Sequence, residues 1–120
     1  MSTHHERVAV LMGGWTPEAS VSRVSASFCG QAARNAGWDA VEIEVDRDIA
    51  AKLAEFKPGR VFNALHGQIG EDGNIQGLLN IMNIPYTHSG LAASAIAMDK
   101  ILAKTMLADC GILVPPTLPL

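Results

Sequence analysis

The sequence predicts an α/β fold, an open parallel sheet of about four strands with helices on both faces. Short apolar segments alternate four times with segments of helical periodicity, the pattern of parallel strands joined by right-handed crossovers. Residues 61–65 form a nearly continuous apolar run, which is typical of a strand covered on both sides. Two of the strands end in glycine-rich loops that hold ionisable residues. Open α/β sheets place their ligand sites at such strand ends.

The length of the 120-residue chain fits one domain, and its composition argues against nucleic acid and membranes as partners. Nine Lys and Arg and twelve Asp and Glu are spread without clusters, so no nucleic acid or anionic membrane is expected. No apolar run is long enough for a membrane span, and no charged leader precedes an apolar core, so we expect a cytoplasmic protein. Cys29 and Cys110 lie among apolar neighbours without metal-binding spacing, which predicts buried, reduced thiols.

The first strand is expected over residues 7–12, where five apolar residues in a row stop at two glycines. Thr16 is then expected to cap a helix, with Pro17 in its first position and Glu18 in its first turn. Gly37 would end that helix. We expect one helix face to pack on the sheet, and the residues at helical spacing are Val21, Val24, Ser25, Phe28, Ala32 and Ala36.

The middle of the chain predicts two strands, a helix between them and a helix after them. Residues 38–45 alternate between apolar and charged side chains, which indicates a partly solvated strand near a sheet edge. A short helix over about 49–56 leads into the strand at 61–65, which we expect to be central. An amphipathic helix follows over 75–82, and then a brief strand over 84–87.

The last third of the chain is helical and then rich in proline. An alanine-rich helix is expected from Gly90 through Ala97, and Asp99 is expected to cap a helix that runs from Lys100 to about Asp109. The apolar, proline-rich end reads as a linker entering a neighbouring domain. We therefore assign residues 1–113 to one domain and residues 114–120 to the start of a linker.

The candidate site lies where two loops meet. With a strand order such as 2-1-3-4, the first and third strands are neighbours whose connections leave in opposite directions, so a crevice opens between them. The loops at their carboxyl ends are 13–18 and 66–73, and these hold Glu18, His66 and Glu71. A carboxylate in the first loop suits an ammonium group and would repel phosphate. The first loop also lacks the G-x-G-x-x-G spacing of a dinucleotide site.

Each candidate also has a purely structural interpretation. Glu18 would then only complement the helix dipole, and His66 would be a histidine that bonds a backbone carbonyl. Glu71 would solvate a turn, or it would orient His66 or a cation from another domain. Lys100 would be a solvated helix charge, although a lysine near a domain boundary is also suited to hold a phosphate.

Four segments, in order and at these spacings, resemble the amino-terminal domain of the D-alanine:D-alanine ligase family. They are VLMGGWTPEASVS (10–22), ALHGQIGEDGNIQG (64–77), IPYTHSG (84–90) and AMDK (97–100). The resemblance covers nearly the whole chain from Arg7. It implies a Rossmann-like domain that precedes the ATP-grasp domains, which would follow the linker. The parent protein would be an ATP-dependent ligase, active as a homodimer in peptidoglycan synthesis, and this piece alone would be inactive.

The resemblance also implies a role for each candidate residue. Glu18 would bind the ammonium of the first D-alanine, and Val21 would contact its side chain. His66 would lie near the substrate carboxylate and the acyl phosphate that ATP forms on it, with Glu71 positioning His66. Lys100 would reach ATP phosphates, and Mg²⁺ would be held by carboxylates outside this chain, so no metal ligand is expected here. The second substrate would be D-alanine, D-lactate or D-serine.

Two other functions stay open from the sequence. The domain could be a non-catalytic module that dimerises or docks a partner through the apolar helix over 75–82. It could also be the same domain of another ATP-grasp ligase, because fold does not fix function.

Overall fold

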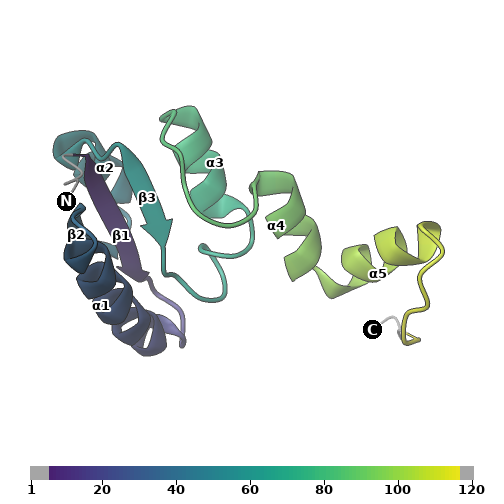
Figure 1. The fold of residues 1–120 in the computed structure, drawn as a ribbon. Helices are drawn as coiled ribbons and strands as arrows, with labels where there is room; N and C mark the ends of the chain where they lie inside the picture. The colour runs from purple at the N-terminus through teal and green to yellow at the C-terminus, as the bar shows by residue number, and fades with distance from the viewer. Residues whose placement is uncertain (1–5, 117–120) are drawn as a thin grey trace.

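The fold is a parallel sheet flanked by helices, followed by two further helices (Figure 1). The computed structural model describes residues 6–116. The elements in chain order are β1 (Arg7–Gly13), α1 (Ala19–Asn35), β2 (Asp39–Val45), α2 (Ile49–Phe56), β3 (Arg60–Asn63), α3 (Asn74–Ile81), α4 (Leu91–Met98) and α5 (Lys100–Asp109). The α/β class and the helical segments are therefore as the sequence predicts.

The sheet has three strands in the order β2-β1-β3, all parallel, so the prediction of about four strands is wrong by one. The fourth segment is reduced to a single parallel bridge between Val61 and Tyr86. The next backbone hydrogen bond of this strand pair is not formed, because the N–H of Asn63 donates to the side-chain hydroxyl of Thr87, at 2.9 Å, and not to a backbone carbonyl. The neighbouring Pro85 also has no N–H to offer. The ladder therefore stops after one residue.

The central strand is β1, and the expectation that residues 61–65 form it is wrong. β1 pairs with β2 along its whole length and with β3 over Val8–Leu11, whereas β3 has only the bridge on its outer side. Residues 7–12 and 61–65 are both apolar runs, so the sequence alone does not tell which of them is the central strand. The alternating strand β2 does lie at a sheet edge, as expected.

Helices cover both faces of the sheet, as expected. On one face α1 packs over Val8, Val10 and Ala40. On the other face α2 and α3 contribute Leu53 and Leu79 to a core that is built on Ala9, Leu11, Val45 and Val61. Because successive residues of β1 point to opposite sides, Ala9 and Leu11 belong to one core and Val8 and Val10 to the other.

Helix α1 packs on the sheet with a different face from the one expected. Its buried residues are Ser22, Ala26 and Gly30, while Val21, Val24 and Phe28 are exposed, the last of them at 75%. Small side chains allow the helix to approach the sheet closely; a Cβ built at Gly30 would lie 1.9 Å from an oxygen of Glu42. The hydrophobic periodicity therefore predicts the helix correctly, but the face that it predicts to pack on the sheet is the one exposed to solvent.

Helix α3 turns its apolar residues inward. Ile75 and Leu79 are buried, and Leu78 and Met82 pack against the same core, leaving Ile81 exposed at 85%. The structure therefore contradicts the idea that this helix offers an apolar docking face, because its own domain already covers that face.

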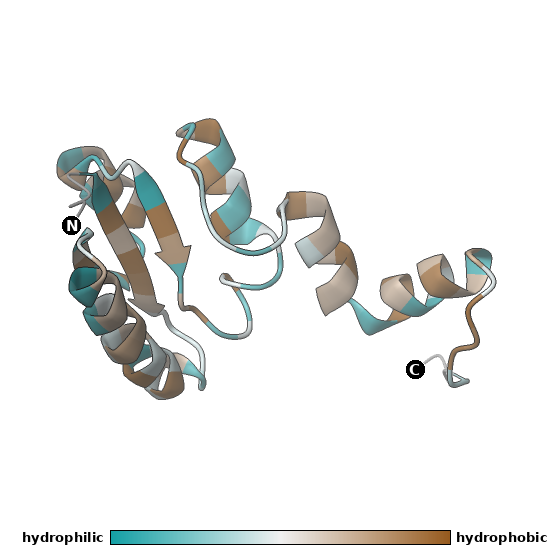
Figure 2. Cartoon of the chain, viewed as in Figure 1, coloured by the Kyte–Doolittle hydropathy of each residue, from teal (hydrophilic) through white to brown (hydrophobic). Residues whose placement is uncertain are grey.

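Helices α4 and α5 extend away from the sheet (Figure 1), and the molecule measures 51 × 31 × 27 Å. Ser94 is the buried residue of α4, and α5 has none. Figure 2 colours much of α4 as hydrophobic although it lies apart from the sheet. The exposed large apolar residues of this part are Leu91, Met98, Ile101, Leu102, Met106, Leu107, Ile112 and Leu113.

The ends of the chain test few expectations. Residues 112–116 have neither helix nor strand, and residues 117–120 of the expected linker lie outside the described part. Both cysteines are free; Cys29 is half-buried, but Cys110 is exposed, so its expected burial is wrong because α5 has no covered face. Within residues 6–116 no helix is long and apolar enough to cross a membrane.

Candidate functional site

The site is built at the carboxyl ends of β1 and β3, beginning with the loop between β1 and α1. The helix begins at Ala19 with Glu18 as its N-cap residue, so the expected cap at Thr16 is wrong. Residues 16–19 instead form a turn, in which the N–H of Ala19 donates to the carbonyl of Thr16 at 3.1 Å. Glu18 is therefore placed at the junction of loop and helix, and its side chain makes no hydrogen bond to the helix end.

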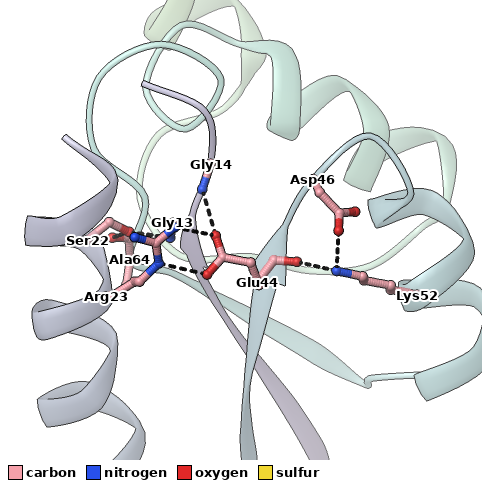
Figure 3. Close-up of polar contacts among 8 residues, drawn as sticks. All are labelled: Gly13, Gly14, Ser22, Arg23, Glu44, Asp46, Lys52 and Ala64. Atoms are coloured by element: carbon pink, nitrogen blue, oxygen red, sulfur yellow. Dashed lines mark hydrogen bonds and ion pairs between the residues drawn. The ribbon is translucent and has the colours of Figure 1, made fainter. Parts of the chain in front are cut away.

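Two hydrogen bonds hold the glycines at the start of this loop (Figure 3). Gly13 has φ of +82° and donates its N–H to the hydroxyl of Ser22 at 3.0 Å. Gly14 donates its N–H to the Glu44 carboxylate at 3.3 Å. The same carboxylate accepts two hydrogen bonds from the guanidinium of Arg23, at 2.9 and 3.1 Å. A Cβ built at Gly13 would lie 1.7 Å from Glu44 Oε2, so the carboxylate fits only against glycine.

The Glu18 carboxylate lies against the loop that follows β3. A Cβ built at Gly67 would lie 2.9 Å from Glu18 Oε2, so the missing side chain leaves room for the carboxylate. The pKa of the Glu18 carboxyl is lowered, most strongly by a hydrogen bond with the Thr16 side chain, then by its own backbone N–H, and also by the nearby His66. Glu18 is exposed and stays anionic at neutral pH.

The His66 ring contacts α1, and Glu71 contacts the backbone beside it. His66 Nε2 lies 3.1 Å from the hydroxyl of Ser25. The Glu71 carboxylate accepts the N–H of Gly67 at 2.8 Å. Glu71 thus holds the residue after His66. The ring itself is contacted by Ser25 rather than by Glu71, and the sequence marks Ser25 only as one residue of a helix face.

Further hydrogen bonds fix the loop after β3, residues 66–73, to β3 and α3. The carbonyl of Gly70 accepts from Asn63 Nδ2 at 2.8 Å and from Gln76 Nε2 at 2.9 Å. Asn63 Oδ1 also accepts the N–H of Leu65 at 3.1 Å. Asn63 and Gln76 are both buried, so the loop rests on fixed polar side chains of β3 and α3.

A hollow of about 550 Å³ lies between this loop and α4. His66 and Glu71 line it, together with His88 from the following turn and Ser94 and Met98 from α4. Glu18 does not line it. His66 thus lines this hollow and also lies near the Glu18 carboxylate, whose pKa it helps to lower.

Two predicted site residues lie outside this cluster. Lys100 is the exposed first residue of α5, which Figure 1 places at the far end of the molecule from α1. Val21 is exposed on α1 three residues after Glu18. Within residues 6–116 no three His, Cys, Asp or Glu side chains lie close enough together to hold a metal ion.

The sequence contained a signal for the serines that sequence reasoning missed. Glu18, Ser22 and Ser25 recur at i, i+4 and i+7, so they share one stripe of α1. Ser22 donates to the carbonyl of Ala64 at 2.8 Å, and Ser25 meets His66, so this stripe follows the end of β3. No such spacing marks Glu44, whose contact with Gly14 depends on the strand register.

The arrangement can bind a small cation next to a polar, ionisable ring. Glu18 offers an exposed carboxylate, which makes short, strong hydrogen bonds with an ammonium group. His66 supplies a ring nitrogen that donates or accepts, according to its protonation. Both stand on loops that hydrogen bonds and glycines fix to the sheet, which preorganises them.

Comparisons of sequence identify relatives of the chain. A family model described as the D-ala D-ala ligase N-terminus matches residues 50–89. A D-alanine–D-alanine ligase from Azorhizobium caulinodans is 53% identical over 110 residues, 92% of this chain and 36% of the relative. A D-alanine–D-alanine ligase B from Brucella suis is 52% identical over 112 residues, with 93% and 36% covered. The chain thus spans little more than a third of these relatives.

Comparisons of structure agree with those of sequence. The D-alanine–D-alanine ligase from Bacillus anthracis, in a crystal structure complexed with ATP, superposes with a TM-score of 0.79 at 32% identity, covering 92% of this chain and 38% of that one. A D-alanyl-alanine synthetase A from Vibrio cholerae, at 23% identity and a TM-score of 0.80, shares the fold. By sequence and by fold, the chain is therefore a relative of the D-alanine–D-alanine ligases and matches their amino-terminal region.

Proposed function

We propose that this chain forms the first-substrate site of an ATP-dependent D-alanine–D-alanine ligase. ATP would phosphorylate the carboxylate of one D-alanine, and the amine of a second would displace the phosphate to give D-alanyl-D-alanine for peptidoglycan. The observation that carries the proposal is the Glu18 carboxylate beside Gly67 and His66, at the carboxyl ends of two neighbouring parallel strands. The relatives named above support the choice of substrate.

Glu18 binds the ammonium group of the first D-alanine in this proposal. Its lowered pKa keeps the carboxylate charged, so a charge-assisted hydrogen bond fixes the substrate and excludes molecules without the amine. Val21, one turn along the exposed surface of α1, contacts the substrate methyl group.

His66 acts at the other end of the same substrate. A ring N–H beside the carboxyl group of that substrate stabilises the negative charge that grows on the carbonyl oxygen of the acyl phosphate when the amine of the second D-alanine attacks it and before phosphate leaves. Glu71, through its hydrogen bond with the N–H of Gly67, holds the backbone next to the ring. Glu71 is therefore a positioning residue in this proposal.

ATP and Mg²⁺ are bound mainly by the rest of the protein. Lys100 is an exposed cation that can meet phosphate oxygens of ATP once a second domain lies beside α5. Mg²⁺ neutralises phosphate charge when it is bound, and its ligands lie outside this chain. The 120-residue chain alone is therefore inactive.

The cellular setting follows from the co-substrate. ATP-dependent synthesis of a cell-wall precursor takes place in the cytoplasm, where the free thiols Cys29 and Cys110 are kept reduced. The complete protein is a homodimer in this proposal, which sedimentation of that protein would test.

Dipeptide synthesis tests the proposed function. The complete protein and the 120-residue chain are each incubated with ATP, Mg²⁺ and D-alanine, and released phosphate and D-alanyl-D-alanine are measured. We expect both products from the complete protein and neither from the short chain. Phosphate and dipeptide in equal amounts from the short chain would contradict the division of labour. Absence of dipeptide from the complete protein would contradict the function.

A further inference from the structure

The contact between Ser25 and His66 joins two segments 41 residues apart in the sequence. The Ser25 hydroxyl lies 3.1 Å from Nε2 of the ring, and both residues are half-buried. A histidine ring turns freely about two bonds unless a partner holds it, and a hydroxyl can either donate to or accept from a ring nitrogen. The contact therefore bears on both the orientation and the tautomer of His66.

The position of Ser25 is fixed by the residues on either side of it along α1. Ser22, one turn earlier, is fully buried; its hydroxyl accepts the N–H of Gly13 at 3.0 Å and donates to the carbonyl of Ala64 at 2.8 Å. Ala26, next to Ser25, is also fully buried against the sheet. The helix is thus fastened to the end of β3 just before His66, and Ser25 has little freedom to move away from the ring.

We infer that Ser25 is a positioning residue for His66, donating its hydroxyl proton to Nε2 and so keeping a proton on Nδ1. This inference rests on the proposed function, in which His66 donates to an anionic substrate group. A neutral ring with its proton on Nε2 would turn a lone pair of Nδ1 towards that anion, which is repulsive. A ring that accepts from Ser25 keeps Nδ1–H as a donor. A protonated ring keeps it too, with Ser25 then accepting.

The other charged groups near the ring do not duplicate this role. Glu71 accepts from the backbone N–H of Gly67. Glu18 is close enough to the ring for His66 to contribute to the lowered pKa of its carboxyl. Because neither is a hydrogen-bond partner of Nε2 within the described residues, removing the Ser25 hydroxyl removes the contact that selects the tautomer.

The test uses the complete protein with Ser25→Ala, Ser25→Thr and the control Ser27→Ala. Ser27 lies on the same helix, two residues away, with an exposed side chain. Nitrogen NMR of the ¹⁵N-labelled histidine rings, with His66 assigned from a His66→Gln variant, reports which ring nitrogen carries the proton. Steady-state kinetics of dipeptide synthesis give kcat and the KM for D-alanine and for ATP.

We expect wild type, Ser25→Thr and Ser27→Ala to show a proton on Nδ1 and a hydrogen-bonded lone pair on Nε2. Ser25→Ala should lose this preference. Its kcat should fall about three- to tenfold, the loss of one orienting hydrogen bond, with the KM for ATP unchanged. Ser25→Thr should restore kcat because it keeps the hydroxyl.

Two results would overturn the inference. One is a neutral wild-type ring with its proton on Nε2, which needs no variant to fold. The other is a Ser25→Ala protein whose ring spectrum and kcat match those of Ser27→Ala. The ring spectrum does not depend on turnover, so it separates this inference from the proposed function. A Ser25-dependent tautomer in a protein that makes no dipeptide would leave the contact standing and remove the ligase function.

Discussion

Two parts of this molecule treat their apolar side chains in opposite ways. The sheet with α1, α2 and α3 buries residues such as Leu11, Leu53 and Leu79 almost completely. The α4–α5 segment, residues 91–109, leaves most of its large apolar side chains exposed within the part of the chain that the structure describes. Apolar side chains therefore form a core in one part and lie on the surface in the other.

The difference shows what hydrophobic periodicity does and does not predict. In both parts it marks where a helix forms, because apolar residues recur at helical spacing. It does not say what covers them. Even within the packed part, α1 turns Val24 and Phe28 to solvent and packs with Ser22, Ala26 and Gly30. Covering depends on the partners that the topology provides.

Truncating one apolar side chain in each part should sharpen the contrast most. Leu11→Ala removes a fully buried side chain from the centre of the sheet and should lower the free energy of unfolding by about 3 kcal/mol or more. Ile101→Ala in α5, where Ile101 is 63% exposed, should change it by about 0.5 kcal/mol or less. Urea unfolding of the 120-residue chain measures both. Similar losses would mean that α5 is packed in solution.

Removing a buried hydroxyl should have the next largest effect. Ser22→Ala leaves the N–H of Gly13 and the carbonyl of Ala64 without their partner and should cost about 1–3 kcal/mol. Ser27→Ala, an exposed change on the same helix, is the control and should be nearly neutral. Urea unfolding again gives the comparison. A neutral Ser22→Ala would show that these bonds do not fasten α1 to the two strands.

Two glycines with positive φ allow a matched test of the site. Gly67→Ala and Gly111→Ala both place a side chain where φ is +73° and +84°, which should cost about 1 kcal/mol of unfolding free energy each. The new Cβ at Gly67 also meets the Glu18 carboxylate, whereas nothing lies within 4 Å at Gly111. D-alanine affinity of the complete protein should therefore fall in Gly67→Ala only. Equal D-alanine affinities of the two variants would contradict the placement of the Glu18 carboxylate beside Gly67.

The smallest expected effect is that of Glu44 on the stability of the fold at low pH. The hydrogen bond with Arg23 is the largest cause of its lowered pKa. Its stabilising contribution is therefore complete above the ordinary value of 4.5 and is lost as the pH falls through the lowered pKa. Glu44→Gln should flatten the loss of stability below pH 4.5, by less than the effect of Ser22→Ala because the pair is partly exposed. Denaturation midpoints at several pH values measure this. Unchanged acid sensitivity would contradict it.

Much of the fold follows from the sequence alone, because strands and helices are local patterns. The bounds of α2 and the cap of α5 are as expected, the latter because the Asp99 carboxylate accepts the N–H of Leu102 at 3.0 Å. The fourth strand was overestimated, since whether a ladder continues depends on a single side chain, Thr87, that competes for an N–H. No propensity reports such a competition.

The sequence predicts which two loops meet at the candidate site, but not the contacts between their side chains and α1. Glu18, His66 and Glu71 could be chosen because glycine-rich loops at strand ends attract ligands, and the structure brings these loops together. The partner of His66 could not be chosen from a loop, because it lies on α1. A polar stripe at i, i+4 and i+7 in a helix next to a strand end is the signal to look for.

The measurement that tests the central claim most directly is the KM for the first D-alanine in Glu18→Gln. The variant keeps the shape of the side chain and removes the charge that faces the ammonium group, so this KM should rise far more than the KM for ATP. Glu55→Gln, an exposed Glu→Gln change on α2, is the matched control and should leave both unchanged. An equal rise in both constants for Glu18→Gln, or no rise in either, would contradict the claim that Glu18 binds the substrate amine.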